Sequence, residues 1–199
     1  MGVIGVEINE VLRDFIGQLT YTYEKYIGEL NLKEGDVKNL NLIEYYKFNS
    51  INDMNKFIYT EAALEIFGHA DQLHDNLMND FNMFLMDIKD DEQHTIQLIS
   101  READKAIPST LFFLSKLGCR AENIRFVSTF EEQWEGIDIL ISANPTALSL
   151  KPDGKMTIKI KSSYNEFVDA DFEFESILEF INDETLINKI LNSEITKLK

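Results

Sequence analysis

The sequence predicts an α/β fold, an open and doubly wound parallel sheet of about five strands with a helical segment inserted after the first strand. Two observations lead to this prediction. Five short apolar runs rich in β-branched residues are spread along the chain, as expected for strands covered on both faces. Between the first two runs lies a long segment whose apolar residues recur at helical spacing instead. A chain of 199 residues can hold one such core and an inserted helical domain.

The five predicted strands are residues 3–8, 95–99, 124–127, 137–141 and 156–160. Between the second and the third lies a predicted helix, with Pro108 in its first turn and Gly118 just past its end. A strand, a helix and a strand in this order form a right-handed crossover. Residues 95–161 are therefore expected to form the body of the sheet, with 3–8 as its central strand. His94, just before the second strand, is expected at the surface.

Helical patterns dominate the segment between the first two strands. They predict helices over 51–67, closed by Gly68, and over 73–88. We therefore divide the chain into an α/β core of residues 1–16 and 93–199 and a helical cap of residues 17–92. A last helix is expected from about Asp183, with these residues in one apolar stripe: Leu186, Ile187, Ile190, Leu191, Ile195 and Leu198.

The composition narrows the expected partners and location. Lysine and arginine number 19 against 35 aspartate and glutamate residues, which gives a net charge of −16. Such a surface repels phosphate backbones and anionic lipids, so neither nucleic acid nor a membrane is an expected partner. A single cysteine, Cys119, forms no internal disulfide, which agrees with synthesis in the cytoplasm. The many Asn, Ile and Lys residues are typical of AT-rich genomes, including those of bacterial viruses, which adds a virion as an alternative location.

Three strand ends carry a recognisable pattern. The first predicted strand ends in Glu7, and Asn9 follows two positions later, before the run VLRDF. This stretch resembles the first motif of the haloacid dehalogenase-like (HAD) phosphohydrolases, and is most similar to the DxDGVLxDF motif of the 5′(3′)-deoxyribonucleotidase branch. The strand that ends in Ser100 resembles the second motif, and the run DILISANP at 138–145 resembles the fourth, DVLIDDxP. The resemblance covers nearly the whole chain and implies a HAD-like Rossmannoid fold with a helical cap.

The residues that perform the chemistry in this family are replaced in this chain. The resemblance matches Glu7 to the aspartate that attacks phosphorus and binds Mg²⁺, and Asn9 to the aspartate that acts as general acid and base. The extra methylene of Glu7 displaces the carboxylate by roughly 1 Å, a misplacement that can lower a rate by about 10²-fold. The neutral amide of Asn9 cannot transfer a proton, a contribution of roughly 10²- to 10⁴-fold. Glu10 replaces a glycine at which the loop turns around the phosphate.

The remaining motifs have also changed. Ser142 and Ala143 replace the metal-binding acidic pair of the fourth motif, and residues 128–134 lack the lysine of the third. Only Ser100 is retained. The resemblance therefore implies a catalytically degenerate protein, a pseudo-phosphatase without catalytic residues, metal site or cofactor. Five positions mark its vestigial pocket: Glu7, Asn9, Ser100, Ser142 and Ala143. The two histidines His69 and His74 are five residues apart and do not share a helical face, so they do not suggest another metal site.

The sequence is compatible with two functions of different classes. The first is a non-enzymatic structural or protein-interaction module that assembles with other protein subunits, for example near the portal or tail of a bacteriophage virion. The alternative is a Mg²⁺-dependent phosphohydrolase or a nucleotide-binding protein for deoxynucleoside monophosphates, with a pocket formed by Glu7, Asn9, Ser100 and Ser142. Turnover in the presence of Mg²⁺ distinguishes the two.

Overall fold

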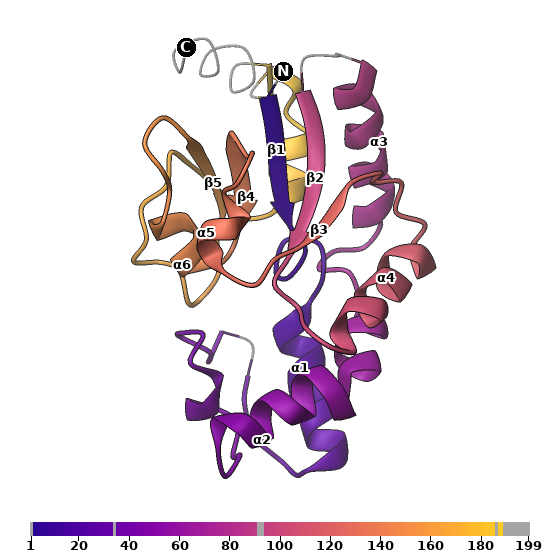
Figure 1. Ribbon diagram of the computed structural model, residues 1–199, viewed down its shortest axis with the longest axis vertical. Coiled ribbons are helices and arrows are strands. Elements are labelled where there is room, and N and C mark those ends of the chain that lie inside the picture. The colour runs from indigo at the N-terminus through magenta and orange to yellow at the C-terminus, as the bar shows by residue number, and fades with distance from the viewer. Residues whose placement is uncertain (1, 34, 91–93, 186, 189–199) are drawn as a thin grey trace.

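The computed structural model describes residues 2–33, 35–90, 94–185 and 187–188. Their centre is one parallel sheet of six strands in the order β3-β2-β1-β4-β5-β6 (Figure 1). The strands are β1 (Gly2–Glu7), β2 (His94–Ser100), β3 (Ile124–Phe126), β4 (Ile139–Ser142), β5 (Met156–Ile160) and β6 (Phe172–Phe174). The predicted parallel α/β sheet is therefore confirmed, with β1 inside it between β2 and β4.

The sheet differs from the prediction in two details. It has a sixth strand, β6, which pairs with β5 at the edge and is only three residues long. Charged residues interrupt its apolar pattern, so no run of apolar residues marks it. The prediction of a surface position for His94 is wrong, because β2 already begins at this residue and its side chain is 3% exposed.

Close packing of the central strand depends on Gly5. A Cβ atom at this position would lie 2.7 Å from Ile99 Cδ1 and 3.1 Å from Ile137 Cγ2. The neighbouring side chains Ile4 and Val6 are almost completely buried. The missing side chain of Gly5 therefore makes room for isoleucines from two flanking segments, which fixes the position of the strand that ends in Glu7.

Helices cover both faces of the sheet. These are α3 (Leu77–Asp90), α4 (Ala106–Lys116), α5 (Phe130–Gln133), α6 (Pro145–Ser149) and α7 (Ile177–Ile181). Helix α3 lies alongside β2 and packs against α7, where the rings of Phe84 and Phe180 are 5.7 Å apart (Figure 1). It begins at Leu77, later than predicted, because Asn76 has a left-handed backbone with φ of 62°.

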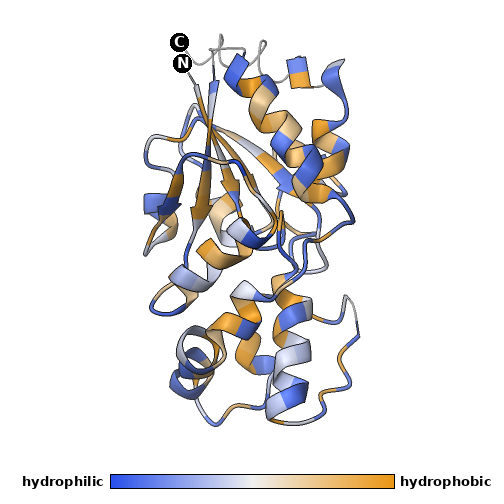
Figure 2. Ribbon diagram, turned by 90° about the vertical axis from the view of Figure 1, so that its right-hand side faces the viewer, coloured by the Kyte–Doolittle hydropathy of each residue, from blue (hydrophilic) through white to orange (hydrophobic). Residues whose placement is uncertain are grey.

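A second group of helices follows β1 and lies beyond the carboxyl ends of the strands (Figures 1 and 2). It consists of α1 (Phe15–Tyr26), the 3₁₀ turn η1 (Leu42–Glu44), α2 (Ile51–Lys56) and the π-helical turns η2 (Phe57–Glu61) and η3 (Leu64–Gly68). The continuous helix predicted over 51–67 is thus replaced by an α-helical turn and two π-helical turns. Orange apolar segments of these helices face one another in Figure 2, and the rings of Tyr23, Tyr46, Phe48 and Phe57 form an aromatic cluster among them.

Two predictions concern residues outside the described ranges. The predicted boundary between cap and core at 92–93 falls there, and so does most of the helix predicted from Asp183, including Leu186, Ile190, Leu191, Ile195 and Leu198. Among the described residues, no helix is both long enough and apolar enough to cross a membrane.

Candidate functional site

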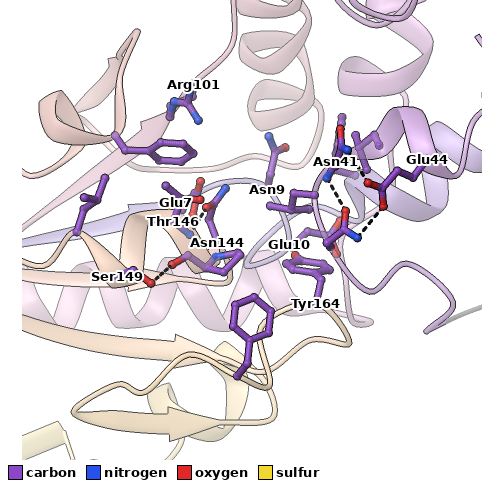
Figure 3. A pocket seen from close by; sticks show the side chains of 18 of the residues that line it. Glu7, Asn9, Glu10, Asn41, Glu44, Arg101, Asn144, Thr146, Ser149 and Tyr164 are labelled. Carbon is purple, nitrogen blue, oxygen red and sulfur yellow. Dashed lines mark hydrogen bonds between the residues drawn. The ribbon is translucent and has the colours of Figure 1, made fainter. Parts of the chain in front are cut away.

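A cavity of about 840 Å³ opens where β1, β2 and β4 end, between the sheet and the helices that follow β1 (Figure 3). In open parallel α/β sheets, ligands bind at this carboxyl edge. The residues that line the cavity are Glu7, Asn9, Glu10, Phe15, Asn39, Leu40, Asn41, Leu42, Glu44, Tyr59, Arg101, Phe130, Asn144, Pro145, Thr146, Ser149, Leu150, Tyr164 and Phe167. The sheet, the first connecting loop and the segment 39–44 thus all contribute to one site.

Glu7 is the last residue of β1 and is 6% exposed. Its Oε2 atom accepts a hydrogen bond from the hydroxyl of Ser142, which itself accepts the backbone N–H of Asn144 at 2.9 Å. Burial raises the pKa of Glu7 above its ordinary value, while the hydrogen bond from Ser142, the nearby amide of Gln133 and the charge of Arg101 act in the opposite direction. The first motif position is therefore a buried carboxyl group held by a neighbouring hydroxyl.

Asn9 belongs to a buried network centred on Arg13. Arg13 is completely buried, and its Nε donates to Asn9 Oδ1 at 2.9 Å. The guanidinium also donates to the Phe67 carbonyl at 3.0 Å and to Thr110 Oγ1 at 2.7 Å, and it forms an ion pair with Glu102. These contacts join the loop after β1 to η3, to α4 and to the end of β2.

The network makes use of both ends of the Asn9 amide. While Oδ1 accepts from Arg13, Nδ2 donates to Glu102 Oε1 at 3.3 Å. An aspartate at this position has no donor for Glu102 when ionised and would place a second carboxylate beside the first. An asparagine at position 9 therefore suits the buried ion pair, which needs its remaining donors and acceptors satisfied.

Glu10 occupies a left-handed backbone position with φ of 59°, where glycine is normally favoured. Its Oε1 atom accepts the backbone N–H of Ile16 at 2.7 Å, at the start of α1. Burial raises the pKa of Glu10 to about 7, and the nearby charge of Asp14 acts in the same direction. Glu10 thus combines a strained backbone with a carboxyl group that is half protonated near neutral pH.

The five predicted pocket positions have different surroundings. Glu7 and Asn9 line the cavity, and Ser142 contacts Glu7. Ser100 is 1% exposed and does not line the cavity, and its hydroxyl has no hydrogen-bond partner among the described residues. Ala143 is buried as well, and its carbonyl accepts from Asn165 Nδ2 at 2.8 Å.

Motif comparison missed two polar residues of the site. Arg101 lines the cavity with its guanidinium 3.5 Å from the centre of the Phe130 ring, so a positive charge is present although the lysine of the third motif is missing. Gln133, fully buried on α5, lies close enough to Glu7 to lower the pKa of its carboxyl group. The sequence feature that could have identified Arg101 is its position directly after a strand, at the carboxyl edge of the sheet.

The motif positions offer Mg²⁺ one carboxylate, Glu7, with one oxygen already engaged by Ser142. Across residues 2–33, 35–90, 94–185 and 187–188, no group of three or more His, Cys, Asp or Glu side chains is placed to hold a metal ion. Magnesium in proteins is bound by carboxylates that leave room for water and phosphate.

Comparisons with known proteins support the fold. No family model matches the chain, and no curated protein matches it. Among solved structures, the chain is similar to a HAD-superfamily hydrolase, subfamily IA, variant 1, from Geobacter sulfurreducens. The TM-score is 0.56 at 11% sequence identity, over 94% of this chain and 96% of that one. The chain therefore has a HAD-like Rossmannoid fold, while the deoxyribonucleotidase branch stays a prediction.

Proposed function

We propose that this protein is a HAD-like module that no longer transfers phosphoryl groups and acts through contacts with other protein subunits. The observation that carries the first part is the buried network of Asn9, Arg13 and Glu102. A general acid and base must exchange a proton with the substrate, and a carboxamide neither gains nor loses a proton near neutral pH. Asn9 is moreover engaged at both ends, so its role in this network is structural.

The surroundings of Glu7 support the same proposal. A nucleophilic carboxylate must be ionised and must approach phosphorus, whereas burial raises the pKa of Glu7 and Ser142 engages one of its oxygens. Charge stabilisation by metal ions is a major part of catalysis in phosphoryl transfer. A site that offers Mg²⁺ one carboxylate at its motif positions is poorly suited to that contribution.

A phosphate-release assay tests this part of the proposal. The purified protein is incubated with Mg²⁺ and either p-nitrophenyl phosphate or each deoxynucleoside monophosphate, beside the Glu7→Gln variant. We expect equal background rates for the two proteins. Turnover by the unmodified protein that disappears in the variant would support the alternative, a Mg²⁺-dependent phosphohydrolase.

An apolar surface patch supports the second part of the proposal. Leu64 of η3 and Leu111 and Phe112 of α4 are 52%, 44% and 44% exposed. A Cβ atom at Gly68 would lie 2.8 Å from Leu64 Cδ1 and 3.2 Å from Phe112 Cδ1, so side chains from both elements meet there. Exposed apolar side chains that cluster, as Leu64 and Phe112 do, are typical of protein-interaction surfaces when the patch is large. Bacteriophage subunits are the proposed partners, on the basis of the composition.

Molar-mass measurement by light scattering tests the assembly. We expect a mass above the 23.0 kDa of one chain, and a shift toward that mass in a Leu111→Glu variant. Cosedimentation with purified phage particles tests the virion location. A protein that stays monomeric at about 100 μM, well above a micromolar dissociation constant, would contradict self-association.

A second candidate function is the binding of a nucleotide without turnover, although the carboxylates of Glu10 and Glu44 in the same cavity oppose an anion. The cavity volume of about 840 Å³ lies in the range of small-molecule sites, and Arg101 offers one guanidinium to an anion. Calorimetric titration with deoxynucleoside monophosphates tests this candidate, which predicts saturable binding that Arg101→Gln weakens.

A further inference from the structure

The cavity at the carboxyl edge of the sheet holds more negative than positive side chains. Glu7, Glu10 and Glu44 line it, against one guanidinium, Arg101. Among the described residues, no Lys, Arg or His forms an ion pair with any of these three carboxylates. Glu10 is partly buried, where a carboxylate without a counter-ion is unfavourable, whereas Glu44 is exposed and the charge of Arg101 acts on Glu7. The net charge of −16 adds to this local excess, so the cavity favours a cationic occupant.

The three carboxylates are spread across the cavity and do not surround one point. Figure 3 shows Glu7 and Glu44 on opposite sides in this view, with Glu10 between them. Glu10 is held by the N–H of Ile16 at 2.7 Å, and Glu44 accepts from the amides of Asn39 and Asn41 at 3.0 and 2.7 Å. A single metal ion needs its ligands around one centre, and no described group of acidic side chains provides this. Separated carboxylates instead match a ligand with separated positive charges.

Aromatic side chains form much of the remaining wall. Phe15, Tyr59, Phe130, Tyr164 and Phe167 all line the cavity. Arg101 already covers one face of Phe130, and one face each of Phe15 and Tyr59 stacks on Phe67. The remaining ring faces attract ammonium groups and pack well against methylene groups. Phe167 is 73% exposed although it borders the cavity, so an apolar chain that entered would cover it. The wall therefore suits a ligand that alternates positive charges with apolar segments.

We propose that this cavity binds a linear aliphatic polyamine, whose ammonium groups pair with Glu10 and Glu44 and whose methylene chain packs against the aromatic wall. The inference rests on the proposed function, because a working phosphoryl-transfer site would place Mg²⁺ and phosphate in the same space. A phosphate dianion would meet the carboxylates of Glu10 and Glu44 and only one guanidinium. Arg101 repels an ammonium group, so it limits the affinity for the polyamine.

Calorimetric titration with spermidine tests the inference at about pH 8 and about 50 mM salt, where screening is weak. We expect saturable binding that Glu10→Gln and Glu44→Gln each weaken by about fivefold, the size of a partly exposed ion pair. The matched control Glu131→Gln removes one exposed charge from α5 outside the cavity and should bind like the unmodified protein. Arg101→Gln should bind more tightly, an outcome that damage to the fold does not produce.

The pH dependence provides an independent readout. Glu10 faces Arg13 and Asp14 of its own loop, Tyr46 of the helices beyond the sheet and Tyr164 of the loop after β5. Because the pKa of Glu10 is about 7, lowering the pH from about 8 to about 6 protonates it and should weaken spermidine binding. The Glu10→Gln variant should lose most of this dependence.

Several results would overturn the inference. These are the absence of saturable heat with spermidine, equal weakening by Glu131→Gln, or butylamine binding as tightly as spermidine. Binding of a deoxynucleoside monophosphate that Arg101→Gln weakens would also overturn it. Phosphate release that depends on Glu7 would instead reject the proposed function, so the two failures are distinguishable.

Discussion

At the scale of single residues, the site is organised by hydrogen-bonding capacity. Asn9 donates to Glu102 and accepts from Arg13, whereas a carboxylate could do only the second. Arg13 is fully buried, and burial lowers the pKa of its guanidinium while Glu102 raises it. The negative charge of Glu102 thus stabilises the charged form of Arg13 in the protein interior.

Removal of one partner of this ion pair should destabilise the protein strongly. Arg13→Met leaves Glu102 buried without its countercharge, and we expect a loss of about 3–5 kcal/mol in the free energy of unfolding. Urea denaturation measures this loss. The double variant Arg13→Met/Glu102→Leu should lose less than the sum of the two single variants. Simple additivity would show that the two side chains are not coupled.

Glu10 should make stability depend on pH. A carboxyl group with a raised pKa binds its proton more tightly in the folded state, so stability falls as the pH rises from the unfolded value of about 4.5 to about 7. The change should amount to roughly 3 kcal/mol, because each unit of pKa corresponds to about 1.4 kcal/mol. Glu10→Gln should flatten this part of the curve, while Glu131→Gln should keep it. The free energy of unfolding is measured by denaturation between about pH 5 and 8. If Glu10→Gln keeps the full dependence on pH, the raised pKa does not belong to Glu10.

The sequence indicated some of these residues and missed others for a physical reason. Glu7 and Asn9 follow one strand at motif spacing, so local pattern was enough to place them at the site. Arg13 lies in the same motif, but its partner Glu102 is 89 positions away, and no local pattern reveals such a pair. Arg101 was likewise missed because its role depends on Phe130, which belongs to another element.

At the scale of elements, the contact between η3 and α4 joins the helices that follow β1 to those around the sheet. The Nη1 atom of Arg13 donates both to the Phe67 carbonyl of η3 and to the Thr110 hydroxyl of α4. Gly68, the last residue of η3, is buried against α4, where the carbonyl of Ser109 would lie 3.3 Å from a Cβ atom. The two elements η3 and α4 are therefore joined twice, by the close contact at Gly68 and by the hydrogen bonds from Arg13.

Gly68→Ala should weaken this contact. The added methyl group would meet Leu64, Phe112 and the Ser109 carbonyl at 2.8, 3.2 and 3.3 Å. The backbone carbonyl yields less easily than the side chains, so we expect a loss of about 1–3 kcal/mol in the free energy of unfolding. Thermal denaturation beside Ser115→Ala, an exposed change on α4, measures the effect. Equal midpoints for the two variants would contradict tight packing at Gly68.

The strands were more predictable than the helices that follow the first of them. Buried parallel strands have continuous apolar runs, and all five predicted runs overlap strands of the sheet. Apolar periodicity does not separate α-helical from π-helical hydrogen bonding, so the two π-helical turns within 57–68 were not predicted. Helix α3 starts where the left-handed backbone of Asn76 ends, a conformation that apolar spacing does not encode.

At the scale of the whole molecule, the fold and the chemistry are separable. The order of strands and the cavity at their carboxyl ends match a HAD-like fold, and similarity to a HAD-superfamily hydrolase extends over 94% of the chain. Function depends on the side chains placed on such a scaffold. Here those side chains form a hydroxyl-bound carboxyl group, a buried ion pair and an acidic, aromatic cavity. The central claim is that this edge of the sheet no longer holds a divalent metal ion.

Electron paramagnetic resonance of Mn²⁺, used in place of Mg²⁺, tests this claim most directly. The signal of free Mn²⁺ is measured with inorganic phosphate and increasing amounts of the unmodified protein or of Glu7→Gln, in which the hydrogen bond from Ser142 can persist. We predict the same weak, non-saturating decrease for both proteins, with no site tighter than about 1 mM. Removal of one equivalent of free Mn²⁺ by the unmodified protein, but not by Glu7→Gln, would contradict the claim.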